Sequence, residues 1–338
     1  MDNLGVILLN MGGPTSLESV RPFLENLFLD REIISFGPVE FARTPLARFI
    51  AKKRAEIVKE NYAMIGGKSP IADLSREQAD ALEKRLREHY GDSMRVRVEV
   101  GFSYWHPFIR EAMDALEKDG YTNVFLMPLY PHYSKTTTGS CFKTWRDLHR
   151  ARGNHLFKVQ SVKAYPAEDA FIDAINARID EGLQLFPEDR RAQVTLQFSA
   201  HGTPVSLVKE GDPYSHQIRE TMEEVMRRRG NDLPYHLSFQ SKVGPAKWLE
   251  PDTVDKAKEL AAAGVRDLLV IPIAFVTEHI ETLHELGIEL REDAEEAGIE
   301  HFHVMPALNA HPLYIEALAA QIVRRYAGRK SIADRHPE

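Results

Sequence analysis

The sequence contains a single cysteine, Cys141. One thiol cannot form an internal disulfide, and it cannot by itself hold an iron–sulfur cluster or a thiolate zinc site. The longest apolar stretch, Leu268–Val276, is much shorter than the ~20 residues that a membrane-spanning helix needs. The first residues, Met1–Val6, lack the basic region and cleavage site of a signal peptide, so we interpret them as the start of a strand. These absences predict a protein of a reducing compartment, and we expect it in the cytoplasm.

The composition excludes two further classes of protein. Of the 338 residues, 43% are hydrophobic and 28% are charged, which is ordinary for a folded protein and unlike a disordered chain. The 43 basic residues are outnumbered by 50 acidic ones, and the net charge of −7 does not favour binding to nucleic acid. A length of about twice the usual domain size predicts two domains.

Short apolar runs alternate with longer amphipathic stretches along the chain. This alternation predicts an α/β fold of parallel sheets with helices on both faces. The predicted strands are Leu4–Asn10, Arg95–Phe102, Asn123–Tyr130, Lys158–Tyr165, Val194–Ser199, Tyr235–Phe239, Asp267–Phe275 and His301–Ala307. The predicted helices are Leu74–Tyr90, Pro107–Asp119, Ala167–Phe186, Ser215–Arg229, Asp252–Ala263, Thr277–Ala297 and Pro312–Ala327.

We expect these elements to form two domains, each with a four-stranded parallel sheet. The first comprises residues 1–134 and is completed by the C-terminal segment 303–338, and the second comprises residues 135–302. Open parallel sheets bind ligands outside the carboxyl ends of their strands. The residues just after each strand are therefore the candidates for chemistry.

Glycines follow the first predicted strand, in Met11-Gly12-Gly13-Pro14. The dinucleotide pattern G-x-G-x-x-G and the Walker pattern are both absent, so a nucleotide site is not favoured. A tight turn between strand and helix is the simpler interpretation.

Polar and aromatic residues follow two later strands. His201 stands in a turn after the fifth strand, where a neutral imidazole can accept a proton or bind a metal, or is simply hydrogen-bonded into the turn. Ser241 and Lys242 follow the sixth strand and suit an anionic group such as a carboxylate. Trp248 is either a flat wall for a planar ligand or part of the core.

Acidic residues recur every fourth position after the seventh strand, at Glu281, Glu285 and Glu289. With Thr277 as the expected N-cap, this spacing predicts one face of an α-helix. The simpler interpretation is the solvated face of an amphipathic helix. The alternative is a column of oxygen ligands that conducts a cation or the protons it displaces, with His279 as a further ligand.

Basic and apolar residues are mixed in the segment Phe41–Asn61. Such a stretch lies on an anionic membrane surface, guards a site for an apolar acid, or is an ordinary surface helix. The negative net charge argues against strong membrane attachment, so peripheral contact at the inner face of the membrane stays open as an alternative.

Taken together and in order, several segments between Leu4 and Tyr326 resemble the ferrochelatase family. They are Asn10-Met11-Gly12-Gly13-Pro14, Phe28-Leu29-Asp30-Arg31, Ile65-Gly66-Gly67-Lys68-Ser69-Pro70, Tyr130-Pro131-His132-Tyr133-Ser134, Phe198-Ser199-Ala200-His201, Gln240-Ser241-Lys242-Val243-Gly244-Pro245 and His279-Ile280-Glu281-Thr282-Leu283. The resemblance implies a lyase of haem biosynthesis that inserts Fe²⁺ into protoporphyrin IX and releases two protons. It also implies two Rossmann-like domains that hold the macrocycle between them.

The resemblance assigns roles to individual residues. It implies catalysis by His201 and Glu281, and we hypothesise that His201 takes the pyrrole protons with Glu281 coupled to it. The implied metal contacts are His201, Glu281, Glu285, Glu289, His279 and Tyr130. The implied porphyrin contacts are the apolar Met11, Trp248 and Phe275, and Arg54, Tyr62, Ser69 and Ser241 near the propionates.

Three positions depart from patterns within this family. Ser103 replaces a usual basic residue, which puts in doubt the role of that wall when the metal enters. Lys135 replaces a cysteine of the cluster-bearing members, so no iron–sulfur cluster is expected. Met11 replaces the tyrosine of the branch that uses coproporphyrin, which favours protoporphyrin IX. A chelatase for cobalt or nickel and a non-catalytic haem or metal carrier stay open as alternatives.

Overall fold

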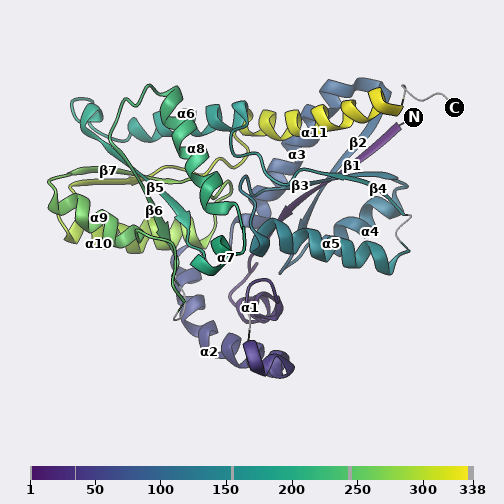
Figure 1. Ribbon diagram of the computed structural model, residues 1–338, viewed down its shortest axis with the longest axis horizontal. Helices are drawn as coiled ribbons and strands as arrows, with labels where there is room; N and C mark the ends of the chain where they lie inside the picture. Colours follow the sequence, from purple (N-terminus) through teal and green to yellow (C-terminus); the bar gives the residue numbers. More distant parts are fainter. Residues whose placement is uncertain (1, 35, 154–155, 243–245, 334–338) are drawn as a thin grey trace.

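The computed structural model describes residues 2–34, 36–153, 156–242 and 246–333, with side chains as far as Tyr326. Its strands form two four-stranded sheets in which all neighbours are parallel. The first sheet has the order β2-β1-β3-β4, and its strands are β1 (Asp2–Asn10), β2 (Met94–Phe102), β3 (Asn123–Pro128) and β4 (Lys158–Ser161). The second has the order β6-β5-β7-β8, and its strands are β5 (Thr195–His201), β6 (Tyr235–Gln240), β7 (Asp267–Pro272) and β8 (His301–Val304). The predicted fold class is confirmed, and Figure 1 shows the two sheets side by side.

Two strands lie in a different sheet from the one that we expected. We expected β4 to begin the second sheet and β8 to return to the first. Instead Lys158 of β4 pairs with Asn123 of β3, and His301 of β8 pairs with Asp267 of β7. Strands that follow one another along the chain are usually neighbours in space, and both strands obey this rule. We therefore propose that each domain contains one complete sheet, which moves the boundaries away from residues 134 and 303.

Four of the eight predicted strands, those that correspond to β3, β4, β7 and β8, are too long at their carboxyl ends. β3 and β7 end at Pro128 and Pro272, because a proline has no N–H to continue the ladder. The apolar runs continue beyond both prolines into connecting loops, and these loops carry Tyr130 and Phe275.

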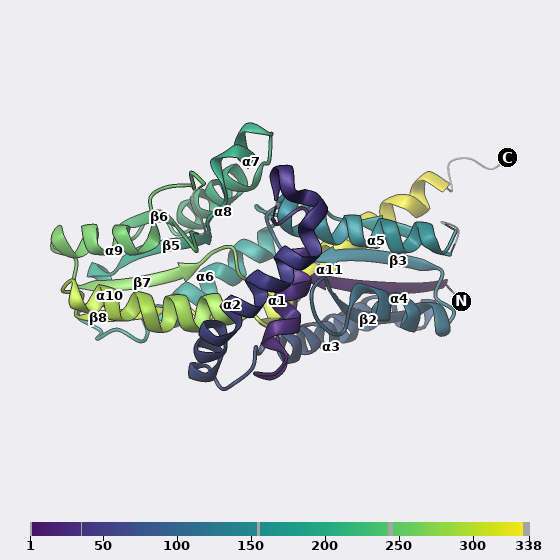
Figure 2. The same ribbon diagram turned by 90° about the horizontal axis from the view of Figure 1, so that it is seen from below.

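Helices cover both faces of each sheet (Figures 1 and 2). On one side a single apolar core runs continuously across both sheets, and the helices that contribute to it are α3 (Ile71–Tyr90), α6 (Asp169–Leu183), α8 (Tyr214–Arg228) and α11 (Pro312–Ala333). On the other side α4 (Ile109–Lys118) and α5 (Ser140–Ala151) pack on the first sheet. There α9 (Thr253–Ala262) and α10 (Leu290–Glu296) pack on the second sheet. The shared core therefore joins the two sheets. A further short helix, α7 (Val205–Lys209), follows β5.

Helices α1 (Val20–Leu29) and α2 (Arg43–Met64) form a hairpin that projects from the body of the molecule (Figure 1). Alanines at Ala47, Ala51 and Ala55 bring α2 close to the apolar side of α1. The buried guanidinium of Arg43 donates to the carbonyls of Phe28, Asp30 and Ile34, so it caps the end of α1. We did not predict α1, whereas α2 corresponds to the basic stretch in the sequence. None of the described helices has both the length and the apolar character required to cross a membrane.

The turn after β1 requires glycine at residue 12. Gly12 has φ +82°, and a Cβ at this position would lie 2.9 Å from the Cβ of Phe102. We predict that Gly12→Ala lowers the free energy of unfolding by about 2–4 kcal/mol, because backbone strain and a steric clash add. Gly66→Ala is the matched control, since Gly66 has φ +99° but open space around it. Urea denaturation should show that Gly66→Ala lowers the free energy of unfolding by about 1–2 kcal/mol. An equal loss of stability in the two variants would contradict the clash at residue 12.

Candidate active site

The candidate residues come from corresponding places in the two sheets. The order of strands reverses between β1 and β3 and again between β5 and β7, and parallel sheets bind ligands at such points. Met11 follows β1 and Tyr130 lies just after β3, whereas His201 ends β5 and Glu281 follows the loop after β7. The topology therefore puts the sequence candidates where ligands are expected.

An imidazole and a carboxylate form the centre of this site. His201 Nδ1 lies 2.8 Å from Glu281 Oε2, and the side chains are 39% and 16% exposed. The hydroxyl of Tyr214 donates to the carbonyl oxygen of His201 at 3.0 Å and fixes the end of β5. The Phe275 ring stands edge-on to the imidazole, with 6.4 Å between the ring centroids. The partly exposed edge of the imidazole remains accessible to a ligand.

A second carboxylate lies beside this pair. The hydroxyl of Ser241 donates to Glu285 Oε2 and lies 3.4 Å from Glu281 Oε2. The amide of Gln240 also donates to Glu285 Oε2, at 3.2 Å, and approaches the backbone carbonyl of Glu281 at 3.4 Å. One serine and one glutamine thus hold the two carboxylates close together.

Burial and mutual charge separate the proton affinities of these three groups. Burial alone would lower the pKa of His201, but the charges of Glu281 and Glu285 and the hydrogen bond to Glu281 outweigh it and raise this pKa to about 8. Burial would raise the pKa of Glu281, but the charge and hydrogen bond of His201 hold it below the ordinary range. Burial and the negative charge of Glu281 together raise the pKa of Glu285. One carboxylate is stabilised as an anion and its neighbour tends to keep a proton.

The charge of Glu281 also reaches residues from the first domain. Burial raises the pKa of Tyr62 and of Tyr130, and the negative charge of Glu281 raises both further. The hydroxyl of Tyr62 is hydrogen-bonded to Ser69, which is itself buried beside Gly13. Tyr62 and Tyr130 therefore lie within reach of the charge of Glu281, and Ser69 is linked to them through its hydrogen bond to Tyr62.

His279 is a neutral, buried neighbour of the pair. A carbonyl oxygen can only accept, so the contact of 3.1 Å between His279 Nδ1 and the Thr277 carbonyl requires a proton on Nδ1. The lone pair then lies on Nε2. Burial lowers the pKa of His279, and its ring packs against Phe275 with 4.7 Å between centroids.

The acidic residues are arranged differently from our expectation. Residues Glu281–Glu289 form a π-helix, labelled η5, which continues into α10. Thr277 is not its N-cap, because the helix begins four residues later and the Thr277 hydroxyl donates to Gln78 instead. In a π-helix each hydrogen bond spans one more residue than in an α-helix, so an interval of four no longer forms a straight stack.

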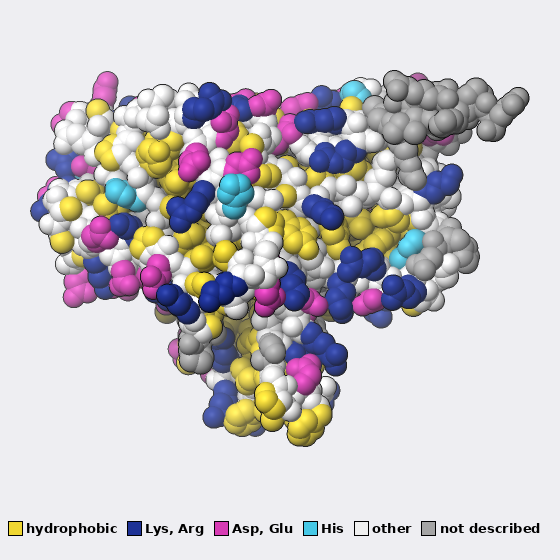
Figure 3. All heavy atoms as spheres, in the orientation of Figure 1, with side chains coloured by type: hydrophobic (Ala, Val, Ile, Leu, Met, Phe, Trp, Pro, Cys, Tyr) yellow, Lys and Arg dark blue, Asp and Glu magenta, His cyan; other side chains and the backbone are white. Residues whose placement is uncertain are grey.

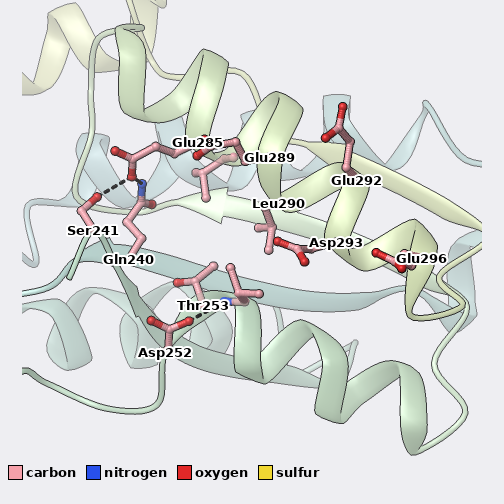
Figure 4. Close-up of a pocket in the computed structure, with 12 residues that line it drawn as sticks. Gln240, Ser241, Asp252, Thr253, Glu285, Glu289, Leu290, Glu292, Asp293 and Glu296 are labelled. Carbon is pink, nitrogen blue, oxygen red and sulfur yellow. Dashed lines mark hydrogen bonds between the residues drawn. The ribbon is translucent and has the colours of Figure 1, made fainter. Parts of the chain in front are cut away.

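The π-helix forms one side of an acidic groove of about 530 Å³. Figure 4 shows Glu285 at the end near Ser241 and the other acidic side chains along the groove. The acidic residues that line it are Asp252, Glu285, Glu289, Glu292, Asp293 and Glu296. Glu289 is exposed and lies beyond the central cluster. Within the described parts of the chain, no three His, Cys, Asp or Glu side chains are arranged to hold a metal.

Three other candidates lie outside the central cluster. Arg54 is exposed on α2, with its guanidinium 5.9 Å from the centre of the Phe28 ring. Trp248 pairs with Pro204 through a backbone bridge, and its buried Nε1 has no hydrogen-bond partner. Met11 packs against the apolar cluster of α1 and α2, to which Ile280 also belongs. In the motif after β6, Val243–Pro245 lie outside the described residues.

The sequence analysis missed two polar residues of the site. Gln240 is the first residue of the motif that contains Ser241, so its position could have drawn attention to it. Tyr214 lies on α8, and only the fold brings its hydroxyl to His201.

We predict that the charge of Glu281 sets the proton affinity of His201. An NMR titration should give a pKa of about 8 for His201, and Glu281→Gln should lower it, because the charge and hydrogen bond of Glu281 that oppose burial are removed and only the charge of Glu285 remains. The pKa of His201 is higher in the folded than in the unfolded protein. The charged pair therefore stabilises the folded protein fully at pH values below the pKa of His201 in the unfolded chain, and this stabilisation is lost as the pH rises through about 8. Glu289→Gln is the control, and an unchanged His201 titration in Glu281→Gln would contradict the assignment.

Comparison with known proteins gives one consistent family. A family model described as Ferrochelatase matches residues 3–326. Among relatives named ferrochelatase, that of Geotalea uraniireducens is 45% identical over 320 residues, which cover 94% of this chain and 96% of the relative. The relative from Geotalea daltonii is 42% identical over 329 residues, with 97% and 99% covered. The relative from Trichodesmium erythraeum is 43% identical over 322 residues, with 94% and 81% covered.

A solved structure supports the fold independently. The structure of SirB from Bacillus subtilis with Fe³⁺ superposes with a TM-score of 0.54 and covers 98% of both chains. Its sequence is only 11% identical, so this likeness concerns the fold alone. With the family model spanning nearly the whole chain and relatives above 40% identity, the protein belongs to the ferrochelatase family of metal chelatases.

Proposed function

We propose that this enzyme inserts Fe²⁺ into protoporphyrin IX, forming protohaem and releasing two protons. The observation that carries the proposal is the contact of 2.8 Å between His201 and Glu281 at the reversal point of the second sheet. Free-base porphyrin has two inner N–H groups whose protons must leave as the metal enters. A site for this reaction needs a proton acceptor that faces the ring and a route for positive charge.

The contact with Glu281 determines which nitrogen of His201 accepts a proton. An ionised carboxylate only accepts hydrogen bonds, so in neutral His201 the proton lies on Nδ1 and the lone pair on Nε2. Nε2 is therefore the base of the neutral form of His201, which is the minor form at pH 7 because the pKa of His201 is raised to about 8. After it takes a pyrrole proton, the negative charge of Glu281 stabilises the imidazolium. Glu285, with its raised pKa, is the next group able to hold a proton on the way to the groove.

Iron and porphyrin then share the enclosure around this pair. The nitrogen and oxygen atoms proposed to meet the iron lie closest together in His201, Glu281 and Glu285. The charge of Glu281 also reaches Tyr130 and His279, and Glu289 lies further along the groove. The apolar side chains proposed against the ring are Met11, Phe275 and Trp248. The groups proposed for the propionates are Arg54, Tyr62, Ser69 and Ser241. Methionine at position 11 favours protoporphyrin IX over coproporphyrin.

We also propose that the enzyme works without a resident iron–sulfur cluster. Such clusters are usually held by four cysteine thiolates, whereas this sequence has one cysteine. That residue, Cys141, is buried, its Sγ contacts the hydroxyl of Ser103 at 3.2 Å, and burial raises its pKa to about 12. A thiol that resists ionisation is a poor ligand for iron.

Replacing the proposed base tests the function directly. His201→Ala should lower kcat for iron insertion by at least about 10²–10⁴-fold, because general-base catalysis typically contributes that factor. Porphyrin binding should be largely retained. The measurement is the absorption change on metallation, under anaerobic conditions, with protoporphyrin and coproporphyrin compared side by side.

The control for this experiment is His216→Ala, an exposed histidine on α8 that should leave turnover unchanged. Unchanged turnover in His201→Ala would remove the assignment of the base. Faster insertion of cobalt or nickel than of iron would indicate another chelatase, and binding of metal and porphyrin without turnover would indicate a carrier.

We further propose that the tip of the α1–α2 hairpin contacts an anionic membrane surface from the cytoplasmic side. Phe41 and Phe49 are 90% and 55% exposed, and Ile57 is exposed on the same helix as Phe49. Exposed cations surround them, including Arg48, Lys52 and Lys53. Figure 3 shows apolar and basic side chains gathered on this projecting part. An apolar tip with a basic rim matches a surface of anionic lipids.

Vesicle sedimentation tests this contact. The protein should sediment with vesicles that contain phosphatidylglycerol but not with pure phosphatidylcholine, and added salt should weaken binding because the electrostatic part is screened. The double variant Phe41→Ser, Phe49→Ser should lose most of the binding. Leu185→Ser removes an exposed apolar residue elsewhere and should have no effect. Equal binding of wild type and the double variant would contradict the proposal.

A further inference from the structure

A buried glutamine of α3 joins the first domain to the loop that leads to Glu281. Gln78 is 0% exposed. Its Nε2 donates to the carbonyl oxygens of Asn309, at 3.0 Å, and Val276, at 3.4 Å. Its Oε1 accepts from the hydroxyl of Thr277 at 3.1 Å. All the polar atoms of this amide are thus used to hold backbone and side chain from a distant part of the sequence.

Apart from those to Gln78, the hydrogen bonds that the described residues make to this loop come from its own domain. The Glu278 amide donates to Asn309 Oδ1 at 3.1 Å, and the Ala307 amide donates to Glu278 Oε1 at 2.7 Å. The Asn309 amide donates to the Val276 carbonyl at 2.7 Å. These bonds link the loop to the segment after β8. The two carbonyls and the hydroxyl held by Gln78 add the link to the first domain.

The same helix carries the opposite side of the site. Ser69 stands just before α3, its amide donates to the Pro14 carbonyl at 2.8 Å, and its hydroxyl is bonded to Tyr62. Gln78 lies nine positions after Ser69, and the helix that begins at Ile71 gives a rigid span of about 11 Å from its first residue to Gln78. Helix α3 therefore contacts both sides of the site. Ser69, with Tyr62 bonded to it, lies at the start of the helix, and Gln78 further along it holds the segment Val276–Glu281.

We propose that Gln78 is a positioning residue that sets where Glu281 stands relative to Tyr62 and Ser69. It does not touch the reacting atoms. It keeps the loop before the π-helix against α3, and so fixes the separation between the side of the site from the first domain and the His201–Glu281 pair. Its effect on turnover rests on the proposed function, whereas its effect on the loop does not.

Gln78→Leu tests the proposal, because it leaves two carbonyls and a hydroxyl without their partner in a buried place. Hydrogen exchange followed by mass spectrometry should show about tenfold faster exchange in the segment 276–283, whose amides at Glu278, His279 and Leu283 are hydrogen-bonded. Displacement of the catalytic pair should lower kcat for metal insertion by about 100-fold, with little change in the KM for porphyrin.

Gln321→Leu is the matched control. Gln321 is also a buried glutamine, but it lies on α11 and donates to Glu168, far from the π-helix. This variant should leave exchange in 276–283 and kcat unchanged. Native exchange in this segment of Gln78→Leu would overturn the proposal, as would an equal loss of kcat in both variants.

Thr277→Val keeps the test decisive if Gln78→Leu does not fold. It removes only the hydroxyl that donates to Gln78, so it should speed exchange in the same segment by a smaller factor. Unchanged exchange in Thr277→Val would then overturn the proposal. If the protein inserts no metal at all, the exchange measurements still decide the role of Gln78 while the proposed function fails separately.

Discussion

The site depends on one constraint, which is that two enclosed carboxylates share a single imidazole. Glu281 and Glu285 both contact Ser241, and this proximity disfavours the ionisation of both carboxyl groups together. His201 supplies a positive charge to Glu281, which keeps Glu281 anionic and leaves Glu285 inclined to hold a proton. Removing His201 or Glu281 leaves the charge of the other without its partner, and a buried charge of this kind is costly. The proton affinities are therefore a property of the cluster and not of any one residue.

The fold brings this cluster together by using the same arrangement of strands twice. In each sheet the order of strands reverses between the two central strands. The central candidate residues follow these two strands in both sheets. The apolar core continues from one sheet to the other, so the two reversal points keep a fixed relation. This explains how the charge of Glu281, from the second sheet, reaches Tyr62 and Tyr130 from the first domain.

The alternation of strands and helices predicted the fold class, whereas the pairing of His201 with Glu281 came from the family resemblance, since local patterns left a simpler interpretation open for both residues. Strands and helices alternate visibly, and His201 stands at the end of a strand within a motif. The sequence did not predict which sheet contains β4 and β8. Both are short strands at the edge of a sheet, and their sequences show no preference for a partner strand. Helix α1 was missed because its apolar residues pack against α2 and not against a sheet. Gln78, Tyr214 and Gln240 act through contacts over long distances in the sequence, for which no spacing rule exists.

The three acidic residues of the π-helix have three different environments. Glu281 is paired with an imidazole, Glu285 is held by Ser241 and Gln240 with a raised pKa, and Glu289 is exposed. A divalent cation beside Glu285 lowers the pKa of that carboxyl and displaces its proton. If iron binds there as proposed, arrival of the metal and departure of a proton are coupled at one side chain, which matches the exchange of positive charge that metal insertion requires.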